Sequence, residues 1–532
     1  MVTAKSGRGL YTVFLNTIGL ILFTATANAE ALTRYRVVKD QDKYPPGVEI
    51  SKHYRVLVKL ASDRSGWDPV KDYTATYKLW PDYQDPETLP VKHKHTAVHI
   101  AQVDANQRIR VKVELHGGDT IKTLRLKPSR YRELFDKQSY GKTWLEFEAE
   151  PGELTKHILV EINAPKLDTD VLNDGLMFFF NPVSKVPKGK IMVLPSGVVG
   201  ADYRHMSKLH SIIIAEDSVY DGLYIPQDTI VNGRIEVRKR GFVVAGRGMV
   251  VGSRWPFVKS VPGWRKRYPE WISPDGRTVK ALVSDKSKDA ADQSFGHFEG
   301  VTVVHPYHFC FEGARVNENL KAFGWRFSSD GIHGTIIRGS FTRVNDDANY
   351  INYGLIEHST YWGMVNGAIF QLGWGLRNDN NAEGKAAHSD IVRGEWDNVD
   401  DPILTMLGAP EGVAAPTAEN LSRNRGVFVG TYRTGAGVVR NKLFEDIRID
   451  AAVNRLFYLG STTGQVSFEN FEFKDIWFEK QPTYEAVENH LHGEKYVKDF
   501  VFDNFRVAGK KIEGMEDLKP LDKKNVRDFI FK

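Results

Sequence analysis

Between Trp325 and Trp374 the chain carries three short motifs of acidic and amide residues, in an order that could build one catalytic wall. The motifs are Ser329-Asp330-Gly331, Asn345-Asp346-Asp347 and Gln371-Leu372-Gly373-Trp374. Asp330 and Asp346 are 16 residues apart, which is one short coil of a repeating β structure, so their side chains could stack on one face. Neighbouring carboxylates repel each other, and this lets one stay protonated as a general acid while another stays ionised as a base. Hydrolysis of a glycosidic bond needs such a pair.

Aromatic residues around these motifs offer flat apolar faces that suit sugar rings. They are Trp325, Tyr350, Tyr353, Trp362 and Trp374. We predict three catalytic residues, Asp346, Asp330 and Asp347. We predict a substrate-binding set of Trp325, Asn345, Tyr350, Gln371 and Trp374.

Asp and Asn side chains also cap backbone groups at turns, and a lone Asp-Asp pair is as often a turn as a catalytic site. We interpret Asp400-Asp401 before Pro402 as such a turn, since it lacks a partner motif. The three motifs in order favour the catalytic interpretation for the other carboxylates. The nearby Arg338, Arg343 and Arg377 leave an anionic substrate open.

The elements that must position these residues are short strands. After Pro187, short apolar segments separated by Gly, Asp and Asn continue for over 300 residues, without the long amphipathic helices of α/β folds. A template of aromatic residue, acid, turn residue and alternating strand begins at Phe298, Phe444, Phe468 and Phe502. The second and third copies are 24 residues apart, a period typical of a parallel β-solenoid. We predict a right-handed parallel β-helix catalytic domain over residues 187–515 and a C-terminal tail over 516–532.

The N-terminal half has a different pattern. From Tyr54 to Asn163, apolar residues alternate with polar ones in short segments separated by turns such as Gly117-Gly118-Asp119. This predicts an antiparallel β-sandwich, which with its linker occupies residues 30–186. Because no cluster of catalytic residue types lies there, we expect an accessory domain. The predicted fold class is all-β, a sandwich followed by a solenoid.

The first 29 residues resemble a secretory signal peptide. Lys5 and Arg8 precede an apolar run from Leu10 to Thr24, and Ala27-Asn28-Ala29 matches a cleavage site. The run is shorter than the roughly 20 residues that span a bilayer. We therefore predict a secreted or periplasmic bacterial protein. Its single cysteine, Cys310, cannot form an intrachain disulfide and is expected to be a buried apolar residue.

The charge pattern excludes several partners. There are 72 basic and 67 acidic residues, and removal of residues 1–29 takes away two basic ones and leaves a net charge of +3. The signs are interspersed, so we expect no nucleic acid or membrane partner. The near-neutral charge is compatible with the polysaccharide substrate that we expect from the motifs. We interpret His93/His95 and His490/His492 as surface histidines and Gly246-Arg247-Gly248 as a turn. We expect no metal, no cofactor and a monomer.

The motif order and the two-part architecture resemble glycoside hydrolase family 49, the dextranases and isopullulanases. That family has Thr-Asp-Gly, Val-Asn-Asp-Asp-Ala and Gln-Met-Gly-Trp, which stand here as Ser329–Gly331, Val344–Ala348 and Gln371–Trp374. The resemblance implies an inverting glycosidase, in which Asp346 protonates the leaving oxygen while Asp330 and Asp347 hold and deprotonate the attacking water. It implies endo-hydrolysis of dextran α-1,6 linkages.

The chain departs from the family in two places. The loop between Asp330 and Asp346 is shorter, and Asn349-Tyr350-Ile351-Asn352 stands where the family has a lysine. Other substrates, pullulan-like or acidic, therefore stay open as alternatives. So do a polysaccharide lyase acting on uronic acids and a non-catalytic solenoid that binds glycans. The Gly-His-Gly and Arg-Ile-Lys motifs of polygalacturonases are not evident.

Overall fold

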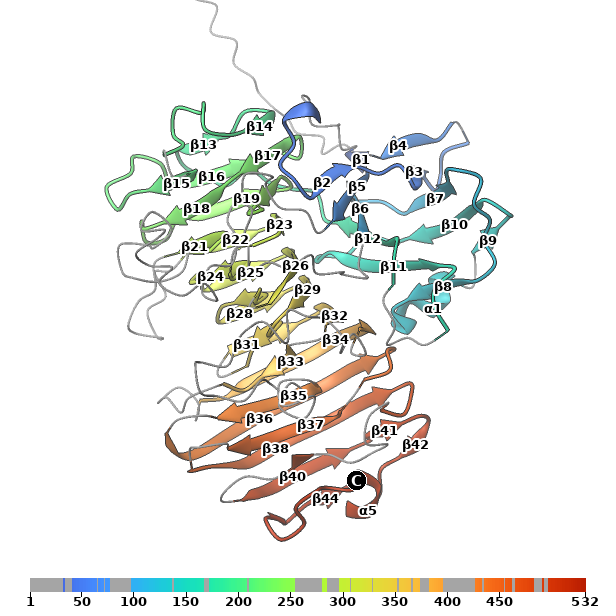
Figure 1. The fold of residues 1–532 in the computed structure, drawn as a ribbon, viewed down its shortest axis with the longest axis vertical. Helices are drawn as coiled ribbons and strands as arrows, with labels where there is room; N and C mark the ends of the chain where they lie inside the picture. Colours follow the sequence, from blue (N-terminus) through green and yellow to red (C-terminus); the bar gives the residue numbers. More distant parts are fainter. Residues whose placement is uncertain are drawn as a thin grey trace, which may run out of the picture. The chain divides into compact units, whose positions relative to one another are not determined.

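The fold is all-β, in a computed structural model. It describes residues 32–33, 41–64, 66–70, 72–76, 97–135, 138–166, 172–207, 210–253, 280–284, 296–306, 308–327, 329–351, 354–364, 367–373, 382–395, 426–432, 435–453, 455–461, 465–482, 490–491 and 496–532. Residues 31–532 form one compact unit. Within it, strands near the N-terminus form two facing sheets and all later strands form a solenoid (Figure 1).

The N-terminal strands form the predicted sandwich. One sheet has the order β2 (Val48–Ile50), β5 (Asp72–Thr76), β6 (Ala97–Ala105), β12 (Gly175–Asn181), β11 (Lys156–Ile162) and β8 (Leu124–Lys127), with β1 (Leu32–Thr33) on β6. The other has the order β4 (Asp68–Val70), β3 (Tyr54–Leu60), β7 (Ile109–Leu115), β10 (Trp144–Ala149) and β9 (Ser139–Tyr140). Pairing is antiparallel except between β6 and β12, which run in the same direction. Alternate residues such as Val56, Val111 and Phe147 fill the core between the sheets.

The solenoid winds three strands per coil, and successive coils pair in parallel. We call the three resulting surfaces the first, second and third faces. The first face contains β13 (Ile191–Val193), β16 (Gly222–Ile225), β19 (Val243–Gly246), β22 (His297–Glu299), β25 (Val316–Glu318), β28 (Ile336–Arg338), β31 (Gly354–Glu357), β40 (Val497–Asp503), β43 (Val526–Arg527) and β44 (Ile530–Phe531).

The second face contains β14 (Gly197–Val199), β17 (Thr229–Asn232), β20 (Met249–Val251), β23 (Thr302–Val304), β26 (Lys321–Phe327), β29 (Phe341–Asn345), β32 (Thr360–Gly363) and β41 (Arg506–Val507), with β42 (Lys510–Lys511) antiparallel to β41. Three long strands run through the first and second faces: β34 (Gly384–Gly394), β36 (Ala436–Ile449) and β38 (Gln465–Phe478). The third face contains β15 (Ser211–Ile214), β18 (Arg234–Val237), β21 (Leu282–Ser284), β24 (Phe311–Glu312), β27 (Ile332–His333), β30 (Asn349–Tyr350), β33 (Ala368–Gln371), β35 (Gly426–Tyr432), β37 (Phe457–Ser461) and β39 (His490–Leu491).

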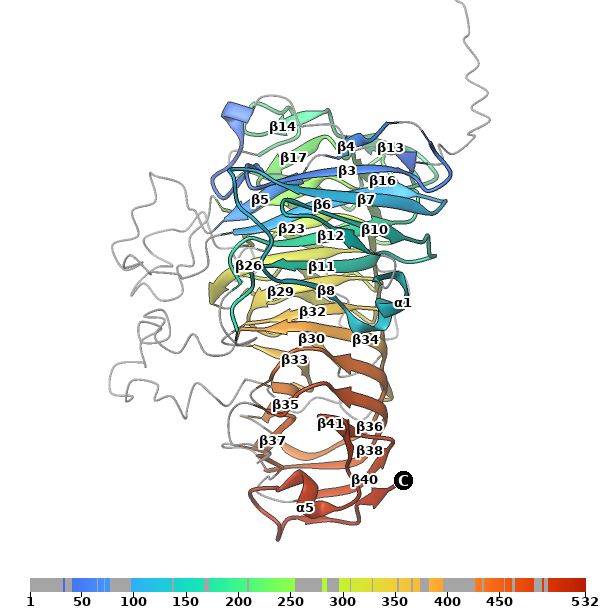
Figure 2. The same ribbon diagram turned by 90° about the vertical axis from the view of Figure 1, so that its right-hand side faces the viewer.

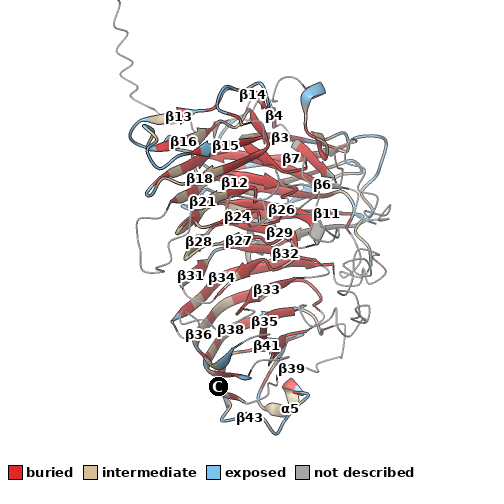
Figure 3. Ribbon diagram, turned by 60° about the vertical axis from the view of Figure 1, so that its left-hand side comes forward, coloured by how far each residue is buried: buried red, intermediate tan, exposed pale blue. Residues whose placement is uncertain are grey.

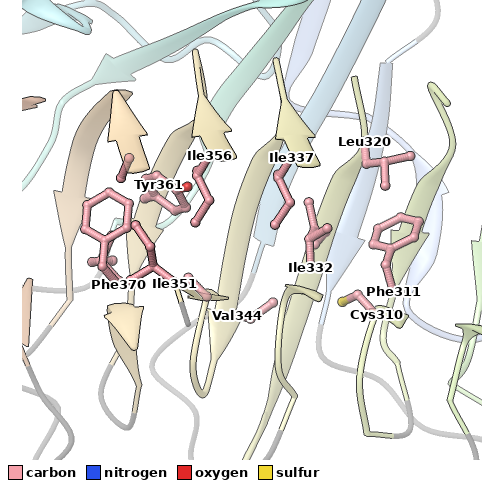
Figure 4. Close-up of a cluster of buried hydrophobic side chains, with 14 of the residues drawn as sticks. Cys310, Phe311, Leu320, Ile332, Ile337, Val344, Ile351, Ile356, Tyr361 and Phe370 are labelled. Atoms are coloured by element: carbon pink, nitrogen blue, oxygen red, sulfur yellow. The ribbon is translucent and has the colours of Figure 1, made fainter. Parts of the chain in front are cut away.

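The interior of the solenoid is apolar because each strand turns alternate side chains inward. Figure 4 shows this core around Phe311, Ile332 and Phe370, which belong to three coils of the third face. Cys310 is fully buried in the same core, which confirms its prediction as a small apolar residue. Figure 3 shows buried strands throughout the solenoid.

The C-terminal coils repeat every 29 residues rather than 24. Phe444 pairs with Phe473 and Phe473 with Phe502, and these pairs of rings stack 5.2 Å apart. Phe531 stacks on Phe502 at the same 5.2 Å. The predicted copy at Phe468 belongs to a different bend of the long strand β38, where it pairs with Val439. The template thus occurs at one bend of β36 and at a different bend of β38, so the 24-residue spacing of these two copies is not the length of a coil.

The residues predicted as a C-terminal tail complete the last coil. β43 and β44 both pair in parallel with β40, and Phe531 extends the ring stack. The short helix α5 (Met515–Leu518) precedes them, with Leu518 buried. Elsewhere in the described ranges, helical structure is confined to η1 (Gln41–Lys43), η2 (Ser129–Tyr131) and α1 (Arg132–Phe135). None of the helices described is long and apolar enough to cross a bilayer.

The turn between the first and second faces uses residues with positive φ. These are Gly300, Asn319, Gly339, His358, His388, Asp446, Asp475 and Asn504, with φ between 49° and 80°. Asn and Asp tolerate this left-handed conformation because their short side chains hydrogen bond locally. Asp446 and Asp475 are therefore structural turn residues. Asp330, Asp346 and Asp347 lie at another corner of the coil.

The sandwich packs on the outside of the second face (Figures 1 and 2). Phe179 of β12 contacts Phe323 and Phe341 of the solenoid, with ring centroids 6.2 and 5.4 Å apart. Polar contacts run along the same interface. From the first coils to the later ones they are Arg247–Asp104, Asn319–Thr155, Thr360–His157, Arg393–Glu161, Asp390–Arg130 and Asp450–Ser129. The sandwich therefore bonds to coils that extend from Arg247 to Asp450.

Candidate active site

The predicted catalytic carboxylates lie where strands of the second face turn into strands of the third face. Asp330 follows β26 and precedes β27, while Asp346 and Asp347 separate β29 from β30 in the next coil. The Gly331 amide donates a hydrogen bond of 2.9 Å to the Asp347 carbonyl, and Ile332 pairs with Asn349. Adjacent parallel strands are about 4.8 Å apart, so Asp330 and Asp347 occupy neighbouring steps of one wall.

Asp347 is held firmly by three donors. Its Oδ2 accepts a 2.8 Å hydrogen bond from the Tyr350 hydroxyl. Its Oδ1 accepts bonds from the Ala368 amide at 3.1 Å and from Gln371 Nε2 at 3.2 Å. Because Asp347 is only 1% exposed, these bonds are needed to stabilise its ionised form.

Gln371 is fixed in turn by its own motif. Its Oε1 accepts a 3.1 Å hydrogen bond from the Gly373 amide, two residues later. The fully buried Gln371 thus acts as a bridge between Gly373 and Asp347. The Gln-x-Gly motif therefore orients the side-chain amide of Gln371 so that it donates to the Asp347 carboxylate.

Asp346 is more exposed than its two neighbours in the wall. Its Oδ1 accepts a 2.9 Å hydrogen bond from the Asp347 amide. In the following coil, a Cβ atom at Gly367 would overlap the Asp346 carbonyl, so only glycine lets the two coils approach here. The Asp346 side chain is accordingly the carboxyl group best placed to meet a ligand from outside.

Ser329 and Asn345 hold the two coils in register. The backbone amide of Asn345 donates a 3.2 Å hydrogen bond to Ser329 Oγ, and the side-chain Nδ2 of Asn345 donates a 3.1 Å hydrogen bond to the Trp325 carbonyl. This contact with the next coil explains why a residue with a hydroxyl group, Ser329, precedes Asp330. Asn345 is 2% exposed, and these bonds give it a positioning role; contact of Asn345 and Gln371 with substrate stays a prediction.

The surroundings of Tyr350 show that the three carboxylates lie close together. Burial raises the pKa of its phenol well above the usual value, and the charges of Asp347, Asp330 and Asp346 raise it further. The hydroxyl therefore remains a donor at any working pH. Tyr350 is partly exposed and is the predicted substrate-binding residue that the structure brings to the wall.

Trp325 lies elsewhere, and its predicted role is wrong. It is fully buried in the cluster beneath the sandwich, with the Arg343 guanidinium 4.6 Å from its ring centroid. Trp362 is buried in the same cluster, 4.9 Å from that guanidinium. Both side chains leave the second face on the side that the sandwich covers, so neither offers a surface to a sugar ring.

Two of the three arginines that could favour an anionic substrate also lie away from the wall. Arg343 pairs with Glu395 at 3.3 Å and is buried. Arg338 pairs with Glu357 at 2.6 Å at the end of β28, on the first face. Their positions remove the sequence argument that rested on them.

The third face contributes residues that the motifs did not identify. His333 lies beside Asp330, with Nε2 3.4 Å from Oδ2. Phe309 packs on the His333 ring, and Lys280 lies over Phe309 while pairing with the buried Glu312. A signal for His333 exists in the sequence, since in the short strand after Gly331 the inward Ile332 makes the next residue point outward.

Several predicted residues lie outside the described residues. They are Trp374, Tyr353, Arg377, Asp400, Asp401, His93, His95, His492 and residues 1–29. Among the residues that are described, no group of three or more His, Cys, Asp or Glu side chains could hold a metal ion. The residues at the wall suit acid–base chemistry on a neutral group, with a partly exposed carboxyl next to two buried ones.

No protein-family model and no curated protein matches the sequence. Among solved structures, the chain matches Dex49A from Penicillium minioluteum, a dextranase of glycoside hydrolase family 49, with a TM-score of 0.59. The match covers 94% of this chain and 98% of Dex49A at 13% sequence identity. The fold predicted from the family resemblance, a β-helix with an N-terminal sandwich, is therefore confirmed.

Proposed function

We propose that the protein is an inverting glycoside hydrolase that cleaves an α-glucan, with endo-hydrolysis of dextran α-1,6 linkages as the specific reaction. The observation that carries this proposal is the grouping of Asp330, Asp346 and Asp347 around Tyr350. The fold shared with Dex49A supports the same class of reaction.

Asp346 is the general acid in this proposal. It is the most exposed of the three carboxyl groups, and two neighbouring carboxylates disfavour a third negative charge. A protonated Asp346 can donate to the glycosidic oxygen as the bond to the anomeric carbon breaks. The leaving sugar then departs as a neutral alcohol.

Asp330 and Asp347 hold the attacking water. Asp347 is kept ionised by Tyr350, Ala368 and Gln371, and Asp330 stands one coil away. A water between them can lose its proton to one carboxylate while it attacks the anomeric carbon from the face opposite the leaving group. The configuration at that carbon is thereby inverted.

The test is product analysis on dextran, pullulan and an acidic polysaccharide side by side. We expect new reducing ends from dextran, initially in the β configuration, as measured by proton NMR of the fresh digest. Equal amounts of α product at the earliest times would contradict inversion. A rise in ultraviolet absorbance, which marks unsaturated products, would indicate a lyase, and release from pullulan alone would move the substrate to a different α-glucan.

Export rests on the pattern of residues 1–29. Expression of the whole chain in a bacterial host, followed by N-terminal sequencing of the exported protein, tests it. We expect the mature chain to begin at Glu30.

A further inference from the structure

We propose that His333 is a positioning residue that holds the carboxylate of Asp330 for the attacking water. This inference rests on the proposed hydrolysis and adds to it a residue outside the three motifs. His333 is the last residue of β27, and its neighbour Ile332 points into the core. The imidazole therefore points outward, on the same side as the carboxylates.

The imidazole is fixed between two aromatic rings. Its centroid is 4.5 Å from that of Phe309 in the preceding coil and 4.6 Å from that of Tyr350 in the next, the latter edge to face at 72°. The side chain is 15% exposed. Two flanking rings leave the imidazole little rotational freedom, so the direction of its Nε2 is set by packing.

That nitrogen faces Asp330. The separation of 3.4 Å between Nε2 and Oδ2 is longer than a good hydrogen bond. Hydrogen bonds of catalytic groups are often long without substrate and shorten when it binds. A donor at Nε2 stabilises the ionised form of a carboxylate that is only 4% exposed.

His333 also completes a connection between the two carboxylates that hold water. Asp330 contacts His333, whose ring contacts Tyr350, whose hydroxyl donates to Asp347. Glu312 of β24 pairs in register with His333, and its charge is neutralised by Lys280. The imidazole is therefore oriented toward Asp330 and Tyr350.

The experiment compares His333→Phe and His333→Gln with the wild-type enzyme on dextran. Phenylalanine keeps a ring between Phe309 and Tyr350 and removes the donor, so kcat should fall about 10- to 100-fold with KM nearly unchanged. The acidic limb of the pH profile should move to higher pH, because Asp330 loses a donor to its ionised form. Glutamine supplies a neutral donor and should restore part of kcat. His116→Phe, at an exposed site in the sandwich, is the control.

The outcomes of this comparison decide whether His333 has a positioning role. If wild-type protein hydrolyses dextran and His333→Phe does so at the same rate and with the same pH profile, His333 has no positioning role. If both variants melt well below wild type, glutamine fails to restore kcat and the pH profile is unchanged, the residue is structural only. If wild-type protein releases no reducing ends from any polysaccharide, the proposed function fails and the role of His333 fails with it.

Discussion

Removal of the Tyr350 hydroxyl tests the reasoning about Asp347 most directly. In Tyr350→Phe the ring can still pack 4.6 Å from His333, while Asp347 loses the 2.8 Å bond to Oδ2 and keeps the two bonds to Oδ1. A hydrogen bond to a buried charged group contributes about 1.5–3 kcal/mol. If that stabilisation serves the transition state, kcat falls about 10- to 150-fold, at 1.36 kcal/mol for each factor of ten.

The same loss has a pH signature. Fewer donors make the ionised Asp347 less stable, so the acidic limb of the kcat profile should move up by about 1–2 pH units, one unit being about 1.4 kcal/mol. The assay is initial rates of reducing-end release from dextran between pH 3 and about 8. Tyr140→Phe, at an exposed tyrosine of the sandwich, controls for the loss of a hydroxyl. A Tyr350→Phe enzyme with kcat within about twofold of wild type and an unmoved acidic limb would refute the role given to this bond.

Three further changes have definite expected outcomes. Asp346→Asn should abolish hydrolysis with an unchanged melting temperature, because an amide cannot protonate the glycosidic oxygen; measurable turnover would contradict its role as the acid. Phe473→Ala, in the middle of the ring stack, should cost about 3–5 kcal/mol in the free energy of unfolding, measured by denaturant titration. Burial lowers the pKa of His157 from 6.5 to about 3, so the folded protein binds fewer protons there and loses stability as pH falls from about 6.5 toward 3. His157→Gln should flatten that part of the melting-temperature curve, whereas His116→Gln should leave it unchanged.

Much of the site could be predicted because its motifs are local. Asp346 and Asp347 are adjacent, and the corner that presents them also requires the nearby Asn345, so a single run of sequence carries the signal. Gln371 is recognisable for the same reason, since its partner Gly373 is two residues away. The positions that short motifs encode were therefore accessible to sequence reasoning.

The sequence could not reveal which strands pack against each other, either between the sandwich and the solenoid or between successive coils. Trp325 alternates outward from β26 as expected, but only the fold shows that the sandwich covers that side. Alternation along a two-residue strand indicates that His333 points outward, but no motif marks it, and its contacts with Asp330, Phe309 and Tyr350 depend on three adjacent coils. The 24-residue spacing differs from the 29-residue coil because the template at Phe468 lies in a different bend from the template at Phe444, and only strand pairing separates the two bends.

The row of contacts between sandwich and solenoid has a consequence for how the molecule opens. An unsupported solenoid frays from its ends, coil by coil, since each coil is held only by its neighbours. Here the sandwich bonds to coils from Arg247 to Asp450, and the coils that contain Asp330 and Asp347 lie inside that interval. Fraying that begins at the C-terminal coils must separate the sandwich from Asp450 and Asp390 before it reaches Asp347. The backbone amides around Asp330 and Asp347 should therefore be among the slowest in the protein to exchange with solvent, even when the last coils are open.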